Sequence, residues 1–559
     1  MAKKRKTTTA ETAESMAKRQ REISVSEFFL KNRHLLGFDS PRKALLTTVK
    51  EAVDNSLDAC EEAGILPEIS VDLRQISEKR FRVSITDNGP GVVRAQIPKI
   101  FAKLLYGSKF HRLKMSRGQQ GIGISAAGMY GQLTTGQSTR IDSKTKGQKH
   151  AHRIAVQIDT KANKPVILAD DEEEWRPTFY PNGKVKPVTY THGTCVTIEM
   201  EAAYIRGRLS VDEYLKQCAI VNPHLQLHYR VNLAKNGKAD EADTSQPADE
   251  PWQTFERAVR VLPEPSGEIK PHPHGVELGL LVQMLKDTHA RTLKSALTQD
   301  FSRVSDRAAQ QICAQAGLNP RANPTRIAHQ ESESLFRAIN EIKLLRPPTD
   351  CLSPISEEQI MAGLKKEIQA DFYTAVTRPP TVYRGNPFQV EVGLAYAKPG
   401  ENKDLGAEEP IRVMRFANRV PLLYMGGGCA ITRAVGQVNW KAYGLTQPRG
   451  SLPVGPMVIM AHMASVWVPF TSESKEAVAH YPEIIRELTF ALQECGRRLS
   501  VYLNRRKRAA EAERKRSYIE LYIPHLALGL KDIMDLSNRE EQKIVTKLRK
   551  MLEKTHLDV

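Results

Sequence analysis

The amino-acid sequence predicts a multidomain protein of the α+β class. Its 559 residues exceed the roughly 250 to 300 at which a single hydrophobic core stops growing, so several domains are expected. Two neighbouring segments, 67–76 and 81–87, alternate apolar and polar residues as half-buried strands do. The turn-forming run SEKR between them predicts an antiparallel pair, and helical stretches accompany this layer.

Composition shifts divide the chain into segments. The first residues are polar and basic and cannot bury enough apolar surface to order themselves, and 236–251 is acidic and rich in Ala and Asp, as linkers are. The predicted segments are a disordered basic tail at 1–20, a helix-and-strand domain at 21–232, a linker or long loop at 233–265, a basic helical module at 266–350, a second strand-rich domain at 351–505, and a charged helical extension at 506–559.

A long helix is predicted at the end of the second strand-rich domain. Apolar residues recur there at alternating three- and four-residue spacing: Ile485, Leu488, Leu492, Cys495, Leu499 and Tyr502. This spacing is typical of a core stripe or of a coiled-coil seam, and we favour the core stripe. The charged helical residues beyond 505 suit a protruding stalk or a surface for a partner.

Charge and cysteine content narrow the functional class. The 82 Lys and Arg residues against 64 Asp and Glu give a net charge of +18, which favours a polyanionic partner such as DNA, although a merely basic soluble protein has the same composition. Seven scattered cysteines without a CxxC pair and without an apolar leader predict a reducing, cytosolic protein without structural zinc. No run approaches the roughly 20 apolar residues of a membrane helix. The basic KKRK run leaves two locations open, the cytoplasm of a prokaryote, associated with the nucleoid, or the nucleus of a eukaryote.

One helical segment, 45–64, carries acids on a single face. Its apolar face consists of Leu46, Val49, Val53, Leu57 and Cys60, and its polar face of Glu51, Asn55, Asp58 and Glu62. A solvated surface would explain the polar face, yet no Lys or Arg occurs from 51 to 73. A carboxylate and an amide one turn apart can instead hold a hydrated Mg²⁺ and orient a water molecule.

Three glycine-containing elements follow in the sequence. Asp87 ends a strand and leads into the turn Gly89–Pro90–Gly91, which could be an ordinary turn or could place a carboxylate and bare backbone against a base. Gly118, Gly121 and Gly123 precede a helix of small residues, where amides can cradle a phosphate. Gly193 and Thr194 begin a further strand, where Thr194 could bind the base or have a structural role only. Each element alone is weak evidence, and their fixed order is the stronger signal.

This order resembles the GHKL ATPase superfamily, which includes gyrase, Hsp90, MutL and histidine kinases. The chain is most similar to the B-subunit family of DNA topoisomerase VI. The resemblance extends over roughly 21–520 and is carried by the segments 24–38, 40–69, 105–136, 271–279, 415–424, 438–445 and 468–479. The acidic run 170–174 and the segment 236–251 depart from the family pattern.

The resemblance implies a GHKL (Bergerat) ATPase sandwich with an N-terminal strap, a helix-two-turns-helix module, and a ribosomal-S5-like transducer with a long C-terminal stalk helix. It implies that Glu51 is the general base, that Asn55 binds Mg²⁺, and that Asp87 reads adenine with Gly89, Gly91 and Thr194 beside it. A mobile lid would contain Lys103, Tyr106, Gly107 and Ser108. The residues expected to wrap the phosphates of ATP are Gly118, Gln119, Gln120, Gly121, Ile122 and Gly123. Lys475 resembles a switch lysine that reaches the γ-phosphate from the transducer.

The family further implies an activity and partners. ATP would dimerise two GHKL domains, with the strap 24–38 exchanged between them, and the closed clamp would trap double-stranded DNA. A separate A subunit would cut a second duplex within an A2B2 heterotetramer, so that supercoils are relaxed and duplexes decatenated. In agreement, this chain has no DxD pair of the kind that a cleavage site uses. The alternatives are a MutL-like or Hsp90-like clamp and a DNA-binding scaffold that does not hydrolyse ATP.

Overall fold

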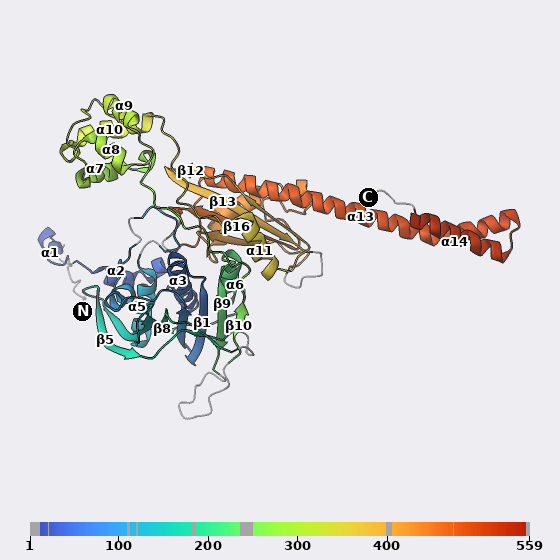
Figure 1. The fold of residues 1–559 in the computed structure, drawn as a ribbon, viewed down its shortest axis with the longest axis horizontal. Helices are drawn as coiled ribbons and strands as arrows, with labels where there is room; N and C mark the ends of the chain where they lie inside the picture. The colour runs from blue at the N-terminus through green and yellow to red at the C-terminus, as the bar shows by residue number, and fades with distance from the viewer. Residues whose placement is uncertain are drawn as a thin grey trace, which may run out of the picture.

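The chain folds into two sheet-based domains, a separate helical module and a long projecting helix (Figure 1). The computed structural model describes residues 12–20, 22–108, 112–118, 121–180, 186–234, 250–397, 405–472 and 474–554. Its helices and strands are mixed within each of the two larger domains, which confirms the α+β class.

An eight-stranded sheet forms the first domain, in the order β10-β9-β1-β2-β8-β3-β4-β5. Its strands are β1 (Glu68–Ser77), β2 (Arg80–Asp87), β3 (Thr139–Lys144), β4 (Ala151–Asp159), β5 (Lys164–Glu173), β8 (Gly193–Glu201), β9 (Gln226–Asn232) and β10 (Gln253–Phe255). A separate two-stranded sheet pairs β6 (Thr178–Phe179) with β7 (Val188–Thr189). The predicted antiparallel pairing of β1 with β2 is confirmed, whereas β1 pairs with β9 in parallel, so the sheet is mixed.

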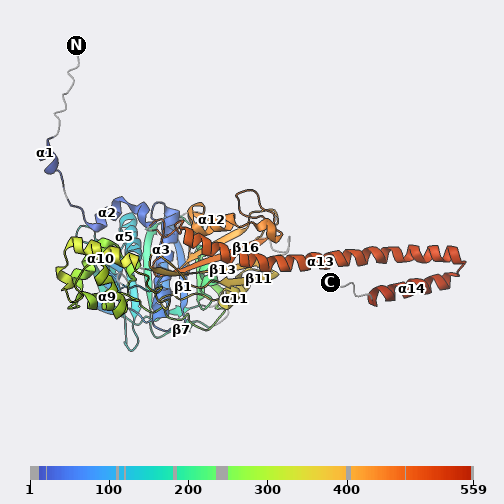
Figure 2. The ribbon, with the colours of Figure 1, turned by 90° about the horizontal axis from the view of Figure 1, so that it is seen from above.

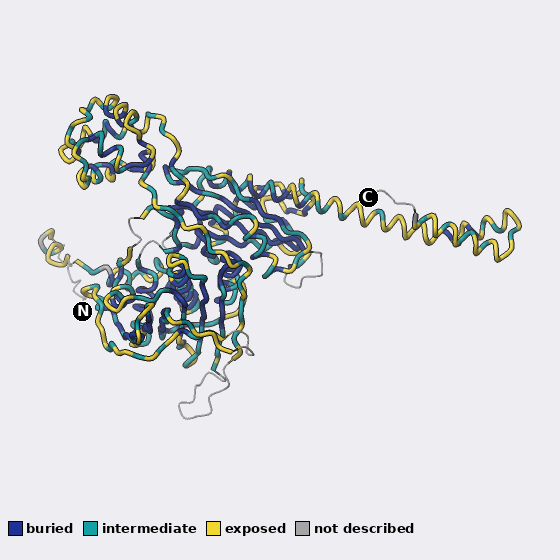
Figure 3. The backbone as a smooth tube through the Cα atoms, viewed as in Figure 1, coloured by how far each residue is buried: buried dark blue, intermediate teal, exposed yellow. Residues whose placement is uncertain are grey.

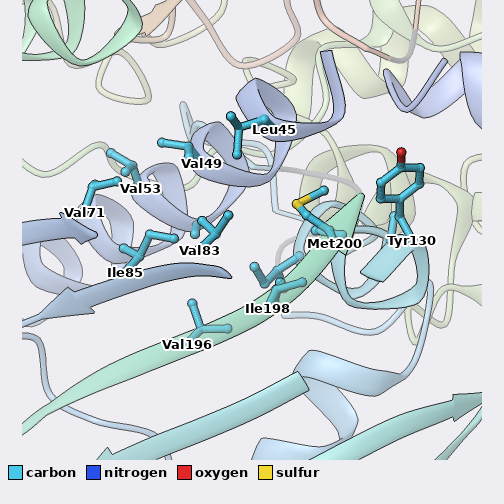
Figure 4. Packing of buried hydrophobic residues seen from close by; sticks show 14 of the residues in the cluster. Leu45, Val49, Val53, Val71, Val83, Ile85, Tyr130, Val196, Ile198 and Met200 are labelled. Carbon is cyan, nitrogen blue, oxygen red and sulfur yellow. The ribbon is translucent and has the colours of Figure 1, made fainter. Parts of the chain in front are cut away.

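Helices cover one face of this sheet and enclose the first core. They are α3 (Pro41–Glu62), α4 (Ile97–Ala102), α5 (Gly123–Thr135) and α6 (Val211–Val221), and the short 3-10 helix η2 (Arg94–Gln96) precedes α4. Helix α3 begins where the Ser40 side chain accepts the backbone N–H of Lys43, with Pro41 at its first turn. The predicted apolar face of α3 is buried against the strands, as Figure 4 shows for Val49 and Val53.

The N-terminal segment departs from the sequence prediction. The predicted disordered tail is wrong at α1 (Ala13–Ala17), which forms a five-residue helix, while 1–11 lie outside the described residues. Helix α2 (Val25–Lys31) and the 3-10 helix η1 (Arg33–Leu36) follow. The Ser24 hydroxyl donates to the Thr160 carbonyl at 2.5 Å, so this segment lies on its own β4–β5 connection.

The helical module has a core of its own. It contains η4 (Pro273–Gly275), α7 (Leu278–Asp287), α8 (Leu293–Asp300), α9 (Asp306–Gln315), η5 (Pro324–Arg326) and α10 (His329–Glu341). Buried side chains of this core include Leu281, Leu297, Ile312 and Leu335. The module projects from both sheets (Figure 1), and its outer surface is largely exposed (Figure 3).

A second sheet lies beside the first. Its strands are β11 (Phe372–Thr377), β12 (Thr381–Tyr383), β13 (Asn386–Tyr396), β14 (Arg412–Ala417), β15 (Val420–Pro421) and β16 (Met457–Ser465), in the order β11-β13-β16-β14-β15 with β12 on β13. Helix α11 (Glu357–Glu367) covers one face, where Ala375 and Ala395 are buried. The other face is covered by α12 (Ala430–Gln437), α13 (Pro482–Met534) and η7 (Trp440–Tyr443), and η6 (Gly426–Gly428) lies next to α12.

Helix α13 begins in this second core and ends far outside it. Leu488, Leu492, Cys495 and Leu499 are buried against the sheet, which confirms the core stripe. The 53-residue helix then runs as an exposed stalk, and α14 (Asn538–Lys554) folds back along its end (Figure 2). None of the helices that the structure describes is long and apolar enough to cross a membrane.

The two sheet domains meet where α6 packs on α11. A Cβ atom at Gly363 would lie 2.2 Å from the carbonyl oxygen of Ile220, so only glycine allows the two helices to approach this closely. Ile220 and Val221 of α6 share a buried cluster with Ile360 and Leu364 of α11. The segment before α13 makes a second contact between the domains, from Glu476 to Lys43 at 2.5 Å.

Candidate nucleotide-binding site

The four sequence motifs surround one cavity of about 650 Å³ in the first domain. Helix α3, the end of β2, the start of β8 and the start of α5 form its walls, and the segment 474–475 of the second domain closes one side. The predicted site residues that line it are Glu51, Asn55, Asp87, Gly91, Tyr106, Gly107, Ser108, Gly118, Gly121, Ile122, Gly123, Thr194 and Lys475.

Two predicted residues lie behind the lining. The backbone N–H of Gly89 donates to Asp87 Oδ1 at 2.9 Å, so this glycine shapes the carboxylate rather than the cavity wall. Lys103 is not part of the lining either, although its amine lies 5.7 Å from the ring centroid of Tyr106, which is. Gln119 and Gln120 lie outside the described residues.

Asp87 is a buried acceptor at the floor of the cavity. Its Oδ2 accepts the Ser56 hydroxyl at 2.9 Å, and its Oδ1 accepts the backbone N–H groups of Gly89 and Thr194 at 2.9 and 3.2 Å. Burial raises the pKa of Asp87 to about 6, against the effect of these donors. At neutral pH it is therefore a carboxylate, and with about four lone-pair positions it has capacity for one more donor.

Gly91 cannot be replaced without a clash. Its φ is +76°, and a Cβ atom there would lie 2.2 Å from the carbonyl oxygen of Lys144 on β3. The next residue, Val92, donates its N–H to the Ser143 hydroxyl at 2.8 Å, and that hydroxyl lies 3.2 Å from the Thr194 hydroxyl. The turn after Asp87 is thus fixed to β3 and β8 and presents bare backbone to the cavity.

The Glu51 side chain lies directly against the start of α5 in the cavity wall. A Cβ atom at Gly123 would lie 1.8 Å from Glu51 Oε2, so the absence of a side chain at 123 makes room for this carboxylate. Helix α5 begins at Gly123, and the amides at a helix N-terminus direct positive partial charge outward. A Cβ atom at Gly118 would lie 3.8 Å from Asn55 Oδ1, which brings the glycine-rich loop close to the amide on α3.

Lys475 reaches the cavity from the second domain. Its amine donates to the carbonyl oxygen of Arg117 at 3.1 Å, next to Gly118. Its own φ is +53°, an uncommon conformation for a residue with a side chain. The neighbouring Ser474 carbonyl lies 3.5 Å from the amine of Lys50, whose pKa burial lowers.

Arg117, next to the cavity-lining Gly118, forms a buried ion-pair cluster that was not predicted from the sequence. Its guanidinium pairs with Asp58 at 2.8 Å and with Glu61 at 2.7 Å, and it donates to the Asn222 side chain at 2.6 Å. Although burial acts in the opposite direction, these two acids raise the pKa of Arg117. The acids in the base-free stretch 51–73 are thus paired with a base from the residue immediately before Gly118.

Lys50 and Ser56 also line the cavity without having been predicted. Both directly adjoin a predicted residue on α3, and no spacing rule distinguishes them from structural neighbours. The apolar part of the wall includes Phe38, Ile100 and Phe101, which suits a flat aromatic ligand group.

The residues present fit a magnesium nucleotide rather than a metal bound by protein alone. In the described part of the chain, no group of three or more His, Cys, Asp or Glu side chains is arranged to hold a metal ion. Asn55 offers one amide oxygen, and Mg²⁺ commonly takes one or two protein ligands together with phosphate and water oxygens.

Comparison with known proteins agrees with this geometry. Residues 41–163 match the family described as histidine kinase-, DNA gyrase B-, and HSP90-like ATPase, and residues 347–515 match the topoisomerase VI B subunit transducer. The fold and the site therefore define an ATPase of the GHKL class joined to a transducer domain.

Close relatives identify the family. The B subunit of type 2 DNA topoisomerase 6 from Methanosarcina acetivorans is 48% identical over 537 residues, which cover 96% of this chain and 81% of that protein. The protein of the same name from Archaeoglobus fulgidus is 45% identical over 534 residues, covering 95% and 83%. The chain belongs to the family of type 2 DNA topoisomerase 6 B subunits. The predicted class, the ATP-dependent B subunit of a type IIB topoisomerase, is confirmed.

Proposed function

We propose that this chain binds and hydrolyses ATP in the cavity between α3 and α5, and that its nucleotide state sets the position of the second domain. One observation carries the proposal: four motifs of the first domain and Lys475 of the second converge on the same cavity of about 650 Å³. A site built from two domains can respond to its ligand by changing the angle between them.

The nucleotide would lie with its base at Asp87 and its phosphates at the start of α5. The spare acceptor capacity of Asp87 suits the amino group of adenine, and the bare backbone at Gly91 lets the ring approach. The N-terminus of α5 and the loop beginning at Gly118 suit the phosphates, because their amides attract negative charge. Mg²⁺ held by Asn55 would neutralise phosphate charge.

Glu51 would act as the general base. Its carboxylate stands beside the start of α5, where the γ-phosphate would lie, and it would accept a proton from the water that attacks phosphorus. General-base assistance contributes about 10² to 10⁴ in rate. Phosphoryl transfer otherwise needs positioning and charge neutralisation, which the loop amides and Lys475 would supply.

Lys475 would report the γ-phosphate to the second domain. Its amine now contacts the carbonyl oxygen of Arg117 at 3.1 Å, a neutral acceptor. A γ-phosphate is a stronger acceptor because it is charged. Exchange of one acceptor for the other would couple ATP binding to the position of the transducer, since ADP offers no such group.

The larger assembly follows from the family. Two copies of this chain would dimerise through their first domains when ATP binds, with the segment 24–38 exchanged, and would enclose double-stranded DNA. The exposed stalk of α13 and α14 would carry a topoisomerase VI A-like protein that cuts DNA in an A2B2 heterotetramer, in the archaeal cytoplasm at the nucleoid. The net charge of +18 supports contact with phosphates, and DNA binding should weaken steeply as salt is added.

Substitution Glu51→Ala tests the proposed chemistry. The variant should bind a non-hydrolysable ATP analogue as the unchanged protein does, while ATP turnover falls by about 10² to 10⁴. Glu78→Ala, in the exposed turn between β1 and β2 and away from the residues that line the cavity, is the control and should retain turnover. Unchanged turnover in Glu51→Ala would remove Glu51 from this role.

A second assay tests the assembly. Supercoiled DNA and ATP are supplied to the chain with and without a co-purified tyrosine-bearing partner. Relaxation that requires both ATP and the partner supports the type IIB reaction, whereas a MutL-like clamp or a passive DNA-binding scaffold would give none.

A further inference from the structure

The segment 113–117, which leads into the glycine-rich loop, is held by the part of the chain that follows the first domain. The carbonyl oxygen of Leu113 accepts the N–H of Ile269 at 3.0 Å. The N–H of Met115 donates to the carbonyl oxygen of Cys351, also at 3.0 Å. A stretch of the ATP site is therefore attached to later elements through its backbone.

Asn418 makes the most direct of these attachments. Its side-chain nitrogen donates to the carbonyl oxygen of Ser116 at 3.0 Å and to that of Ser465 on β16 at 2.9 Å. Its side-chain oxygen accepts the N–H of Ser465 at 2.9 Å. One buried amide group thus joins the loop of the ATP site to a central strand of the second sheet.

The turn that carries Asn418 is held rigidly in the second domain. Asn418 and Arg419 have φ values of +48° and +63° and connect β14 to β15 as a two-residue hairpin, in which Asn is favoured. The buried Arg419 guanidinium donates to the carbonyl oxygens of Ser353 and Pro354 at 3.3 and 3.0 Å. Its backbone N–H donates to His462 Nε2 on β16 at 3.0 Å.

On the other side of the bridge, Ser116 is two residues from the cavity. Arg117 follows it, fixed to the acids of α3 through its side chain, and Gly118 then lines the cavity. Two successive carbonyl oxygens, those of residues 116 and 117, therefore accept donors from the second domain, Asn418 for one and Lys475 for the other.

We propose that Asn418 is a positioning residue for ATP turnover. It keeps the phosphate-facing loop at a fixed position relative to the second domain. The inference rests on the proposed function of the cavity and extends it. When Lys475 leaves the Arg117 carbonyl for a γ-phosphate, the bridge from Asn418 to Ser116 remains and is the tie to the transducer nearest to the cavity, with the Met115–Cys351 backbone bond one residue further away. Without the bridge, movement of the lysine toward the γ-phosphate is passed less directly to the loop, and the preference for triphosphate over diphosphate weakens.

The test compares two variants of the full-length chain. Asn418→Gly tolerates the left-handed backbone and removes the amide. Asn418→Asp keeps the acceptor for Ser465 and also tolerates this conformation, while it removes both donated hydrogen bonds. Arg384→Gly is the matched control, because Arg384 has a φ of +45° in the β12–β13 hairpin of the same sheet and does not line the cavity.

The readout is the affinity for ADP and for a non-hydrolysable ATP analogue, both with Mg²⁺, together with kcat, KM and the melting temperature. For both Asn418 variants we expect ADP affinity within about twofold of the unchanged chain, because the base site at Asp87 is separate. The preference for the triphosphate and kcat should each fall about tenfold, the value of roughly one hydrogen bond. Arg384→Gly should change neither.

Two results would overturn the inference. One is an unchanged triphosphate preference with kcat within twofold of normal, whatever the melting temperature. The other is an equal loss of affinity for both nucleotides, which indicates a merely structural contact. The Glu51→Ala variant distinguishes failure of this inference from failure of the proposed function. If Glu51→Ala retains turnover, the proposed function is wrong. If Glu51→Ala is inactive and the Asn418 variants are fully active, only the role of Asn418 is refuted.

Discussion

Substitution Gly123→Ala isolates the position of the general base from the stability of the fold. Gly123 is the first residue of α5, where alanine is a better helix former by about 0.5 to 1 kcal/mol. The added Cβ atom would lie 1.8 Å from Glu51 Oε2, 2.4 Å from its Cδ and 2.9 Å from its Cγ. The obstacle is the far end of a flexible side chain, so the fold can accommodate the methyl group only if Glu51 swings away.

The size of the effect follows from this displacement. Ordinary contact begins at 3.4 Å, so the carboxylate oxygen has to retreat by more than about 1 Å. A misplacement of about 1 Å can cost about 10² in rate, and full loss of a general base about 10² to 10⁴. We therefore expect kcat to fall by at least about 100-fold, while the melting temperature is unchanged or slightly raised.

Phosphate release from ATP measures turnover, and titration with a non-hydrolysable analogue measures binding. Gly436→Ala is the control, because Gly436 lies within α12 and has no neighbouring atom within 4 Å of an added Cβ. The double variant with Glu51→Ala should be no slower than Glu51→Ala alone, since both changes remove the same group. Turnover of Gly123→Ala within threefold of normal would refute the placement of Glu51.

Three further predictions concern other parts of the cavity. Gly91→Ala should lower the melting temperature sharply, because its Cβ meets the Lys144 carbonyl at 2.2 Å and its φ is +76°; a thermal melt close to normal would contradict this. The affinity for adenosine, which has no titrating phosphate, should be constant above about pH 7 and should fall roughly tenfold per pH unit below about 6. Burial raises the pKa of Asp87 to about 6, and only the carboxylate form accepts the amino group. An affinity that calorimetry finds unchanged from pH 5 to 7.5 would exclude this role. Lys475→Ala should bind the triphosphate analogue about ten- to a hundredfold more weakly, which is the contribution of a charge-assisted hydrogen bond, and should retain its affinity for ADP. ATP-dependent strand passage at the normal rate in this variant would rule out the switch.

Local patterns predicted the local parts of this structure. The apolar face of α3, the β1–β2 hairpin and the helix after Gly123 each depend on residues close in sequence, and all three are confirmed. The parallel pairing of β1 with β9 was not predicted, because alternation identifies a strand but not its neighbour in a sheet.

Local sequence patterns did not predict the contacts between the domains. Asn418 and Ser116 are 302 positions apart, and no periodicity relates them. Lys475 was assigned only through the family resemblance, and the structure now places its amine at the cavity. The pairing of Arg117 with Asp58 likewise requires the fold, because the two residues are 59 positions apart.

A structure of the full-length chain with a non-hydrolysable ATP analogue and Mg²⁺ tests the central claim most directly. We expect the adenine amino group on Asp87, the triphosphate along the loop from Gly118 to Gly123, and the Lys475 amine on the γ-phosphate instead of the Arg117 carbonyl. An analogue bound elsewhere, or a Lys475 amine still on Arg117 with the analogue in the cavity, would contradict it.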